Sequence, residues 1–191
     1  MARPPKRHLV ASLIEHESCI YLTHKQCWDP TSRLKSAREE GAGFFQITRA
    51  YKANGLLRFD ALEELRTKYR KELYELNWHN IYSRPDLQIR AGILKLKENY
   101  FVFVPYAVNS EEALAFADAA YNGGINGVND ERRACVLTKN CDPRKWFGNT
   151  ELLCLKSKVG LYGNRSACDI NRHHVQDVLR IRANKYAPFF N

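Results

Sequence analysis

Glu17 is the residue whose type and position most directly allow chemistry. Apolar spacing and the breaker Pro4-Pro5 predict a helix that runs to about Cys19. Leu13 and Ile14 precede Glu17 by four and three residues, so its side chain is expected along the apolar face. A carboxyl group packed against apolar neighbours can hold a proton near neutral pH, as a general acid must. The alternative is a helix-end glutamate that faces solvent or pairs with an arginine.

Two further segments give Glu17 a context. Residues 41–48 read GAGFFQIT, and residues 120–124 read AYNGG at the predicted end of a later helix. Together with the Glu17-Ser18 pair, these segments resemble the signatures of the soluble lytic transglycosylases and goose-type lysozymes. Those signatures are a Glu-Ser pair ending a helix, a Gly-x-Gly-Leu-Met-Gln turn and an Ala-Tyr-Asn-x-Gly helix end. The resemblance covers roughly residues 5–130, and the tail from Asp142 looks closest to bacteriophage-encoded members.

The resemblance implies an enzyme that cleaves the β-1,4 bond between N-acetylmuramic acid and N-acetylglucosamine in peptidoglycan. Glu17 would act first as acid and then as base, while the sugar's own 6-hydroxyl attacks and leaves a 1,6-anhydro product. No metal or organic cofactor is implied. The substrate-binding residues would be Ser18, Phe45, Gln46, Thr48, Tyr121 and Asn122, with Tyr121 also orienting Glu17.

A hydrolytic lysozyme mechanism is the alternative, and it needs a further acid to position water. Glu39 or Glu40 would take that role, although both also fit a solvated loop of mixed charge. Thr48 stands where goose-type enzymes tend to carry an acid, and Phe44-Phe45 replaces the usual Leu-Met. Because threonine cannot replace that acid, Thr48 favours the transglycosylase.

The elements expected to carry these residues are mainly α-helical and form a single lysozyme-like domain over residues 1–191. Residues 28–43 read as a loop, strand signals are weak, and residues 142–172 read as a loop-rich lobe in which Trp146 lines a glycan groove or a small core. Asn109 and Glu112 suggest a capping box. Helices are expected over residues 60–76, from Pro85 to about Tyr100, from Asn109 to Gly123-Gly124, and over residues 175–186 within a C-terminal segment 173–191 that packs on the core.

The chain has 30 Lys and Arg against 21 Asp and Glu, a net charge of +9 over 191 residues. Such a charge suits nucleic acid, an anionic membrane face or an anionic wall polymer, or it serves solubility alone. No stretch is long and apolar enough to span a bilayer, and the N-terminus lacks a secretory pattern. We therefore expect a monomer made in a host bacterial cytoplasm and released to the cell wall as an endolysin, or carried on a virion.

Six cysteines permit three disulfides in any of fifteen pairings. Proximity suggests Cys19 with Cys27, Cys135 with Cys141, and Cys154 with Cys168; buried thiols are the alternative. The absence of a C-x-x-C pair speaks against a structural zinc site.

Two readings from other classes compete with the enzyme. A basic module for nucleic acid would explain the charge, but no RRM, KH, zinc-finger or helix-turn-helix pattern is present. An inactive glycan-binding relative would keep the motifs without the reaction. The expected partners are thus peptidoglycan strands and anionic envelope polymers, with no specific nucleic acid.

Overall fold

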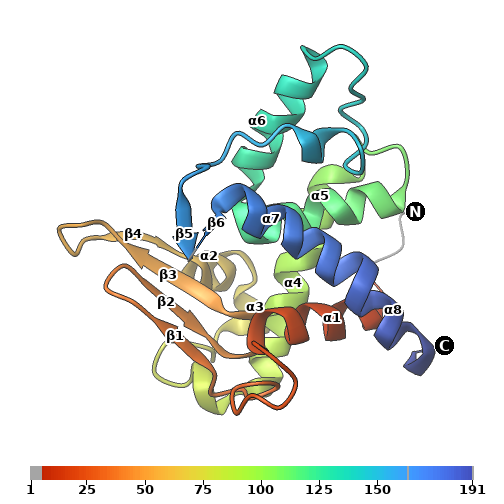
Figure 1. Ribbon diagram of the computed structural model, residues 1–191. Coiled ribbons are helices and arrows are strands. Elements are labelled where there is room, and N and C mark those ends of the chain that lie inside the picture. Colours follow the sequence, from red (N-terminus) through yellow and green to blue (C-terminus); the bar gives the residue numbers. More distant parts are fainter. Residues whose placement is uncertain (1–5, 163, 191) are drawn as a thin grey trace. The chain divides into compact units, whose positions relative to one another are not determined.

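A computed structural model describes residues 6–162 and 164–190 and is mainly helical, as the sequence predicts (Figure 1). The chain divides into two compact units, which are treated separately. The sheet unit is Val10–Lys95. The helical unit comprises the described residues before Val10 and those from Leu96 onward. No helix among the described residues is long and apolar enough to cross a bilayer.

The sheet unit contains a four-stranded antiparallel sheet in the order β1-β2-β3-β4. Its strands are β1 (Arg33–Lys35), β2 (Glu39–Ala42), β3 (Ile47–Tyr51) and β4 (Leu57–Asp60). The prediction of a loop over residues 28–43 is therefore wrong for β1 and β2. These strands are short and rich in charged residues, so no apolar alternation announces them. β1 pairs with β2, and β2 pairs with β3, which sets Gly41 opposite Thr48; these pairings supply their hydrogen bonds.

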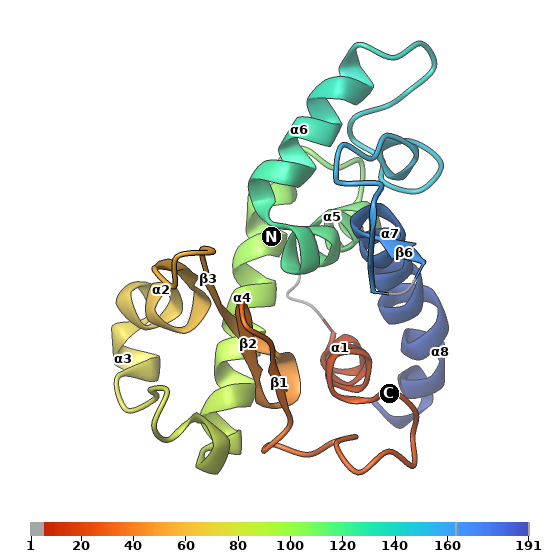
Figure 2. The same cartoon turned by 60° about the vertical axis from the view of Figure 1, so that its left-hand side comes forward.

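Helices complete this unit. They are α1 (Arg7–Ser18), α2 (Ala61–Lys68), α3 (Arg70–Leu73) and α4 (Pro85–Phe103), with 3-10 turns at Gly43–Phe45 and Ile81–Ser83. Helices α1 and α4 each continue into the helical unit. The predicted starts at Asp60 and Pro85 are confirmed, and the Asp60 carboxylate accepts from the amide of Glu63. Helix α2 lies against β3 (Figure 2).

The single helix expected over residues 60–76 is broken. Tyr69 leaves helical geometry at φ −114° and ψ 50°, which separates α2 from α3. The apolar stripe is nevertheless right, because Leu62, Leu65, Leu73 and Leu76 are all buried. Apolar spacing reports which side chains face the core, not whether the backbone hydrogen bonds continue between them.

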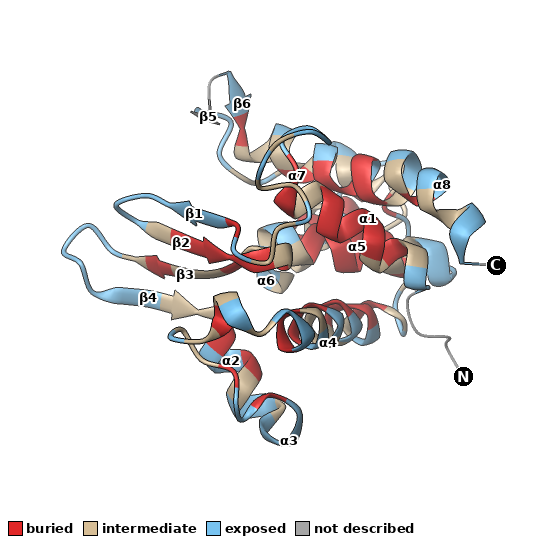
Figure 3. Cartoon of the chain, turned by 90° about the horizontal axis from the view of Figure 1, so that it is seen from below, coloured by how far each residue is buried: buried red, intermediate tan, exposed pale blue. Residues whose placement is uncertain are grey.

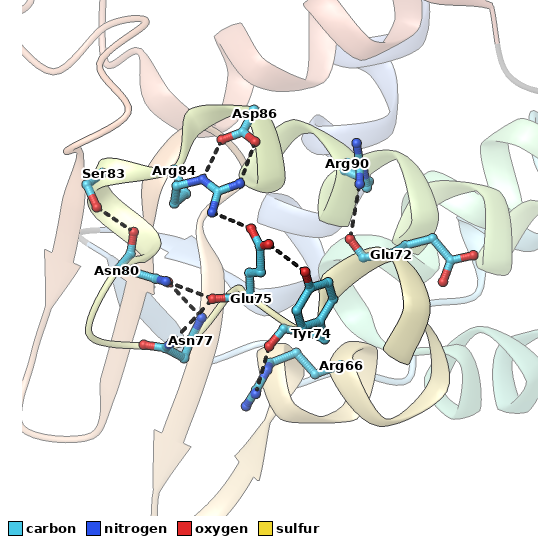
Figure 4. A network of polar contacts seen from close by, with 10 residues as sticks. All are labelled: Arg66, Glu72, Tyr74, Glu75, Asn77, Asn80, Ser83, Arg84, Asp86 and Arg90. Carbon is cyan, nitrogen blue, oxygen red and sulfur yellow. Dashed lines mark hydrogen bonds and ion pairs between the residues drawn. The ribbon is translucent and has the colours of Figure 1, made fainter.

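A polar network fixes the chain between α3 and α4 (Figure 4). Arg84 donates to Asp86 at 2.9 Å and to Glu75 at 2.7 Å, and Glu75 also accepts from the hydroxyl of Tyr74 at 2.7 Å. The segment that follows α3 is thereby tied to the first turn of α4.

Within the four-stranded sheet, the buried residues lie on β2 and at Ile47 and Ala50 of β3, whereas β1 is exposed and β4 is exposed or half-buried (Figure 3). The buried Phe45 ring, just before β3, packs against Gly92 of α4. A β-carbon at Gly92 would lie 2.4 Å from that ring, so only glycine allows the helix to approach so closely.

The helical unit contains α5 (Ser110–Gly123), α6 (Ile125–Val136), α7 (Ala167–Gln176) and α8 (Ala183–Tyr186). A π-helical segment, Asp177–Arg182, joins α7 to α8, and 3-10 turns lie at Thr150–Leu152 and Ala187–Phe189. A small hairpin pairs β5 (Gly160–Tyr162) with β6 (Arg165–Ser166). Its core gathers Phe103, Ala115, Phe116, Ala119, Ala120, Val128, Trp146 and Val175.

The start and end of α5 are confirmed, but its predicted capping box is half formed. Asn109 accepts from the amide of Glu112, and Gly124 ends the helix at a φ of 80°. The Glu112 carboxylate instead accepts from the amides of Trp146 and Phe147. Trp146 is fully buried, edge-on to Phe116 at 5.7 Å, so it is a core residue and does not line a groove.

The C-terminal boundary is also corrected. Helix α7 begins at Ala167, well before the predicted residue 175, and thus shortens the lobe expected over residues 142–172. Ser166 and Asp169 form a capping box at its start, a local signal that the sequence analysis missed. The three suggested disulfides, Cys19–Cys27, Cys135–Cys141 and Cys154–Cys168, are all present.

Replacing Gly92 with alanine should lower the free energy of unfolding by about 1–3 kcal/mol, because the new methyl group overlaps Phe45. Denaturant unfolding followed by circular dichroism measures the change. Gly127→Ala in α6 is the matched control, since its β-carbon would meet only Nζ of Lys156, the far end of a long side chain, and alanine favours a helix. Equal stability of the two variants would contradict the close packing of Phe45 on α4.

Candidate active site

The last turn of α1 holds Glu17 in a half-buried position. The neighbouring Ser18 hydroxyl donates to the carbonyl of Ile14 at 2.7 Å and accepts from the amide of Trp28 at 3.2 Å. The Cys19–Cys27 disulfide closes the intervening chain. Ser18, which the sequence analysis assigned to substrate, is buried and holds the end of the helix in place.

Glu15 is a second carboxylate of α1 that the sequence analysis missed. It is buried, whereas Glu17 is only half-buried. Residues 11–15 are buried without interruption, so α1 has no single buried stripe at its centre. Spacing from Leu13 and Ile14 therefore could not predict which of the two glutamates is more deeply buried.

Close packing requires each of the two glycines in the turn at residues 41–48. Gly43 adopts a φ of 69°, and a β-carbon there would lie 2.1 Å from the side-chain oxygen of Gln88. That oxygen accepts from the amide of Phe44 at 3.0 Å, and the same side chain donates to the carbonyl of Pro30 at 2.9 Å. The fully buried Gln88 of α4 thus supports the turn from behind. Its place in a helical pattern gave no sign of this role.

Gly41 makes room for Gln46 in the same way. A β-carbon at Gly41 would lie 2.6 Å from Oε1 of Gln46. Gln46 adopts the left-handed conformation, and its Nε2 donates to the carbonyl of Gly43 at 2.9 Å and to Ser32 Oγ at 3.2 Å. Its Oε1 is buried and has no hydrogen-bond partner among the described residues. The amide is therefore held in one orientation, and its oxygen is a buried acceptor.

Two neighbours in this turn serve the fold. Phe45 is buried against Gly92, and the Thr48 hydroxyl donates to the carbonyl of Gln46 at 2.6 Å. The resemblance implies that both bind substrate. In the structure they hold the backbone that carries Gln46.

Glu40 is the centre of an ion-pair cluster and not part of a solvated loop. Its carboxylate is buried on β2 and pairs with Arg33 of β1 at 2.5 Å and Arg49 of β3 at 2.7 Å. It also accepts from the Tyr82 hydroxyl at 3.2 Å. Burial alone would raise the pKa of Glu40, but the hydrogen bonds from Arg49 and Arg33 outweigh it and hold the pKa below its ordinary value.

Glu39 differs from Glu40 in its burial and in the face of the strand that it occupies. It is only half-buried, it faces the opposite side of β2, and it stands opposite Ala50 in the register. Of the two candidate water-positioning acids, one is thus committed to two arginines and the other lies on the other face of the strand.

Tyr121 and Asn122 lie at the end of α5 in the helical unit, and both contact α7. The Asn122 side-chain oxygen accepts from Asn171 at 3.0 Å, and the Tyr121 ring stacks on His174 with centroids 6.2 Å apart. His174 Nδ1 lies 2.7 Å from the carboxylate of Asp118, and both residues are buried. The expected hydrogen bond from Tyr121 to Glu17 stays a prediction.

The Asp118 and His174 pair escaped the sequence analysis because the two residues are far apart in the chain. The same holds for the fully buried Glu131 of α6, which pairs with Arg172 at 2.9 Å and with Lys156 at 3.6 Å. Such partners become visible only when α7 is placed against α5 and α6.

A cavity of about 480 Å³ opens beside α2 and α3. Its walls come from Glu63, Arg66, Thr67, Arg70 and Tyr74. None of the residues predicted to act on substrate lines it.

Comparison with protein families, with curated proteins and with solved structures gave no significant match. The candidate site therefore depends on its own residues and contacts.

Glu40→Gln should destabilise the sheet unit by about 1–3 kcal/mol at neutral pH, between the values for exposed and buried ion pairs. Because the folded state depresses the pKa of Glu40, this stability is present above the ordinary value of 4.5 and is lost as pH falls below it. Denaturant unfolding of the variant and wild type should therefore converge in acid. Glu39→Gln is the control and should change little; a pH-independent difference for Glu40→Gln would contradict the ion-pair assignment.

Proposed function

We propose that this protein degrades peptidoglycan by cleaving the β-1,4 bond between N-acetylmuramic acid and N-acetylglucosamine, with Glu17 as general acid and base. The observation that carries the proposal is the turn at residues 41–48. Its glycines are required by the packing of Gln46 and Gln88, so the resemblance there extends beyond a common pair of glycines to a supported, pre-oriented amide.

The helix end is the second support. Glu17 is half-buried on a turn that Ser18 and the Cys19–Cys27 disulfide hold in place. A carboxyl group on a rigid, partly desolvated support meets the positional demand of general acid catalysis.

The proposed reaction is an intramolecular transfer. Glu17 donates its proton to the glycosidic oxygen, which leaves with the departing sugar. The 6-hydroxyl of the muramic sugar attacks its own anomeric carbon and returns its proton to the Glu17 carboxylate. The product carries a 1,6-anhydro ring, no water is consumed, and Glu17 ends in its starting state.

The contacts of Glu40 favour this transfer over hydrolysis. A lysozyme of this kind needs a second acid to position water. Glu40 is paired with Arg33 and Arg49, and Thr48 is not an acid. The transglycosylase mechanism needs only one catalytic carboxyl group, so we propose that mechanism.

The setting follows from the same proposal. A net charge of +9 would concentrate the protein at a polyanionic envelope before any specific contact. We propose that the chain acts as a phage endolysin, made in the host cytoplasm and released to the wall when a holin opens the membrane. Peptidoglycan strands and anionic envelope polymers would be its partners.

Glu17→Gln should lower the clearing rate of peptidoglycan suspensions roughly a thousandfold, within the range of general acid–base contributions. Circular dichroism and thermal unfolding should match the wild type, because the side chain is only half-buried. Glu64→Gln, on the exposed face of α2, is the control and should clear at the wild-type rate. Full activity of Glu17→Gln would remove the central residue of the proposal.

Mass spectrometry of the released fragments decides between the two mechanisms. The transferase gives 1,6-anhydro ends, and Glu39→Gln should then leave the rate unchanged. Reducing ends, together with a loss of activity in Glu39→Gln, would establish the lysozyme instead. Binding of the protein to sacculi with no released fragment would favour a non-catalytic glycan-binding protein.

A further inference from the structure

The loop after α1 turns apolar side chains toward solvent. In this disulfide tip, residues 19–28, three consecutive side chains are largely exposed: Ile20 at 75%, Tyr21 at 59% and Leu22 at 60%. Trp28, at the far end of the tip, is exposed as well. Single exposed apolar residues are ordinary, but a run of three beside an exposed tryptophan indicates a contact surface.

The disulfide tip is held in this form by its own bonds. Besides the Cys19–Cys27 disulfide, the amide of His24 donates to the carbonyl of Tyr21 at 2.9 Å. The amide of Cys27 donates to the carbonyl of His24 at 2.8 Å. The Tyr21 ring meets the His24 ring edge-on at 5.2 Å. A loop that is already ordered loses little conformational entropy when it binds.

The tip itself, residues 19–28, contains Lys25 and no Asp or Glu. Between Glu17 and Glu39 the chain carries Lys25, Arg33, Lys35 and Arg38 against the single acid Asp29. The Asp29 carboxylate accepts from the amide and hydroxyl of Thr31, and Arg33 pairs with Glu40. Lys25, Lys35 and Arg38 are exposed and form no ion pair with any described residue. The exposed apolar side chains of the tip thus share their loop with an available cation, Lys25.

These features together favour a lipid surface. Ile20 and Leu22 offer aliphatic groups, which gain by leaving water for acyl chains and supply no hydrogen bonds to a sugar. Tyrosine and tryptophan prefer the boundary between headgroups and acyl chains. Basic residues beside them are attracted by anionic headgroups. We propose that the disulfide tip inserts into the surface of a bilayer containing anionic lipid.

This inference is separate from the proposed glycosidase, because lipid vesicles contain no glycan. The oxidised full chain is sedimented with vesicles of phosphatidylcholine alone and with vesicles that also contain phosphatidylglycerol. We expect binding to the anionic vesicles, weakened by salt. The double variant Ile20→Ser/Leu22→Ser should lower the partition coefficient by at least about tenfold.

The matched control is Leu56→Ser/Leu57→Ser, which changes the residue before β4 and the first residue of that strand. These leucines belong to the same unit and are 60% and 53% exposed, so the control removes a comparable apolar surface elsewhere. It should bind like the wild type. Equal losses in both double variants, or no binding of the wild type to anionic vesicles, would overturn the proposal.

A measurement on the unmodified chain guards against misfolded variants. Brominated lipids should quench part of the tryptophan fluorescence, and Trp28→Phe should remove most of that quenching, since Trp146 is fully buried and Trp78 is half-buried under Arg49. Absence of quenching would refute insertion of the tip. A serine variant that keeps vesicle binding but loses binding to peptidoglycan sacculi would assign the tip to glycan and likewise overturn the proposal.

Discussion

The sheet unit is organised around one buried carboxylate with two guanidinium groups. Glu40 alone would be costly to bury, and Arg33 and Arg49 offset that cost from the strands on either side. Arg49 also lies over the Trp78 ring at 4.4 Å, and the Trp78 ring nitrogen donates to Asp60 at 2.8 Å. One charge cluster therefore connects three strands to the cap of α2. The register that it shares sets Gly41 opposite Thr48 and so shapes the turn beyond β2.

That turn shows how glycine positions encode packing. Gly41, Gly43 and Gly92 each leave space for one side chain, namely Gln46, Gln88 and Phe45. Two glutamine amides are thereby fixed in a turn that contains no charge of its own. In the proposed enzyme this rigidity would matter more than the number of acids, because a single carboxyl group needs its sugar held in one pose. The arrangement also explains why Phe45 and Thr48 serve the backbone of the turn.

The three disulfides close short loops, and two of them end a helix. Cys19 directly follows α1, and Cys135 lies in the last turn of α6. In each loop the residues directly after the first cysteine are exposed and aliphatic: Ile20 in one, Val136 and Leu137 in the other. The disulfide bond stabilises the end of the helix, so these residues can remain outside a core while the helix stays folded. At the first loop, charge adds a reason to expect an anionic surface as the partner.

The sequence by itself determined what depends on near neighbours. Asp60 and Asn109 cap their helices, Gly124 ends α5, and each cysteine pairs with the next one along the chain, since all of these act across a few residues. The motif at residues 41–48 was visible for the same reason. Tertiary structure alone decided the sheet, the burial of Glu40, the support of the turn by Gln88 and the pairing of Asp118 with His174. These contacts join residues that are distant in the chain. The sequence of a charged strand or of a helix containing glutamine is the same whether or not the fold brings a partner residue next to it.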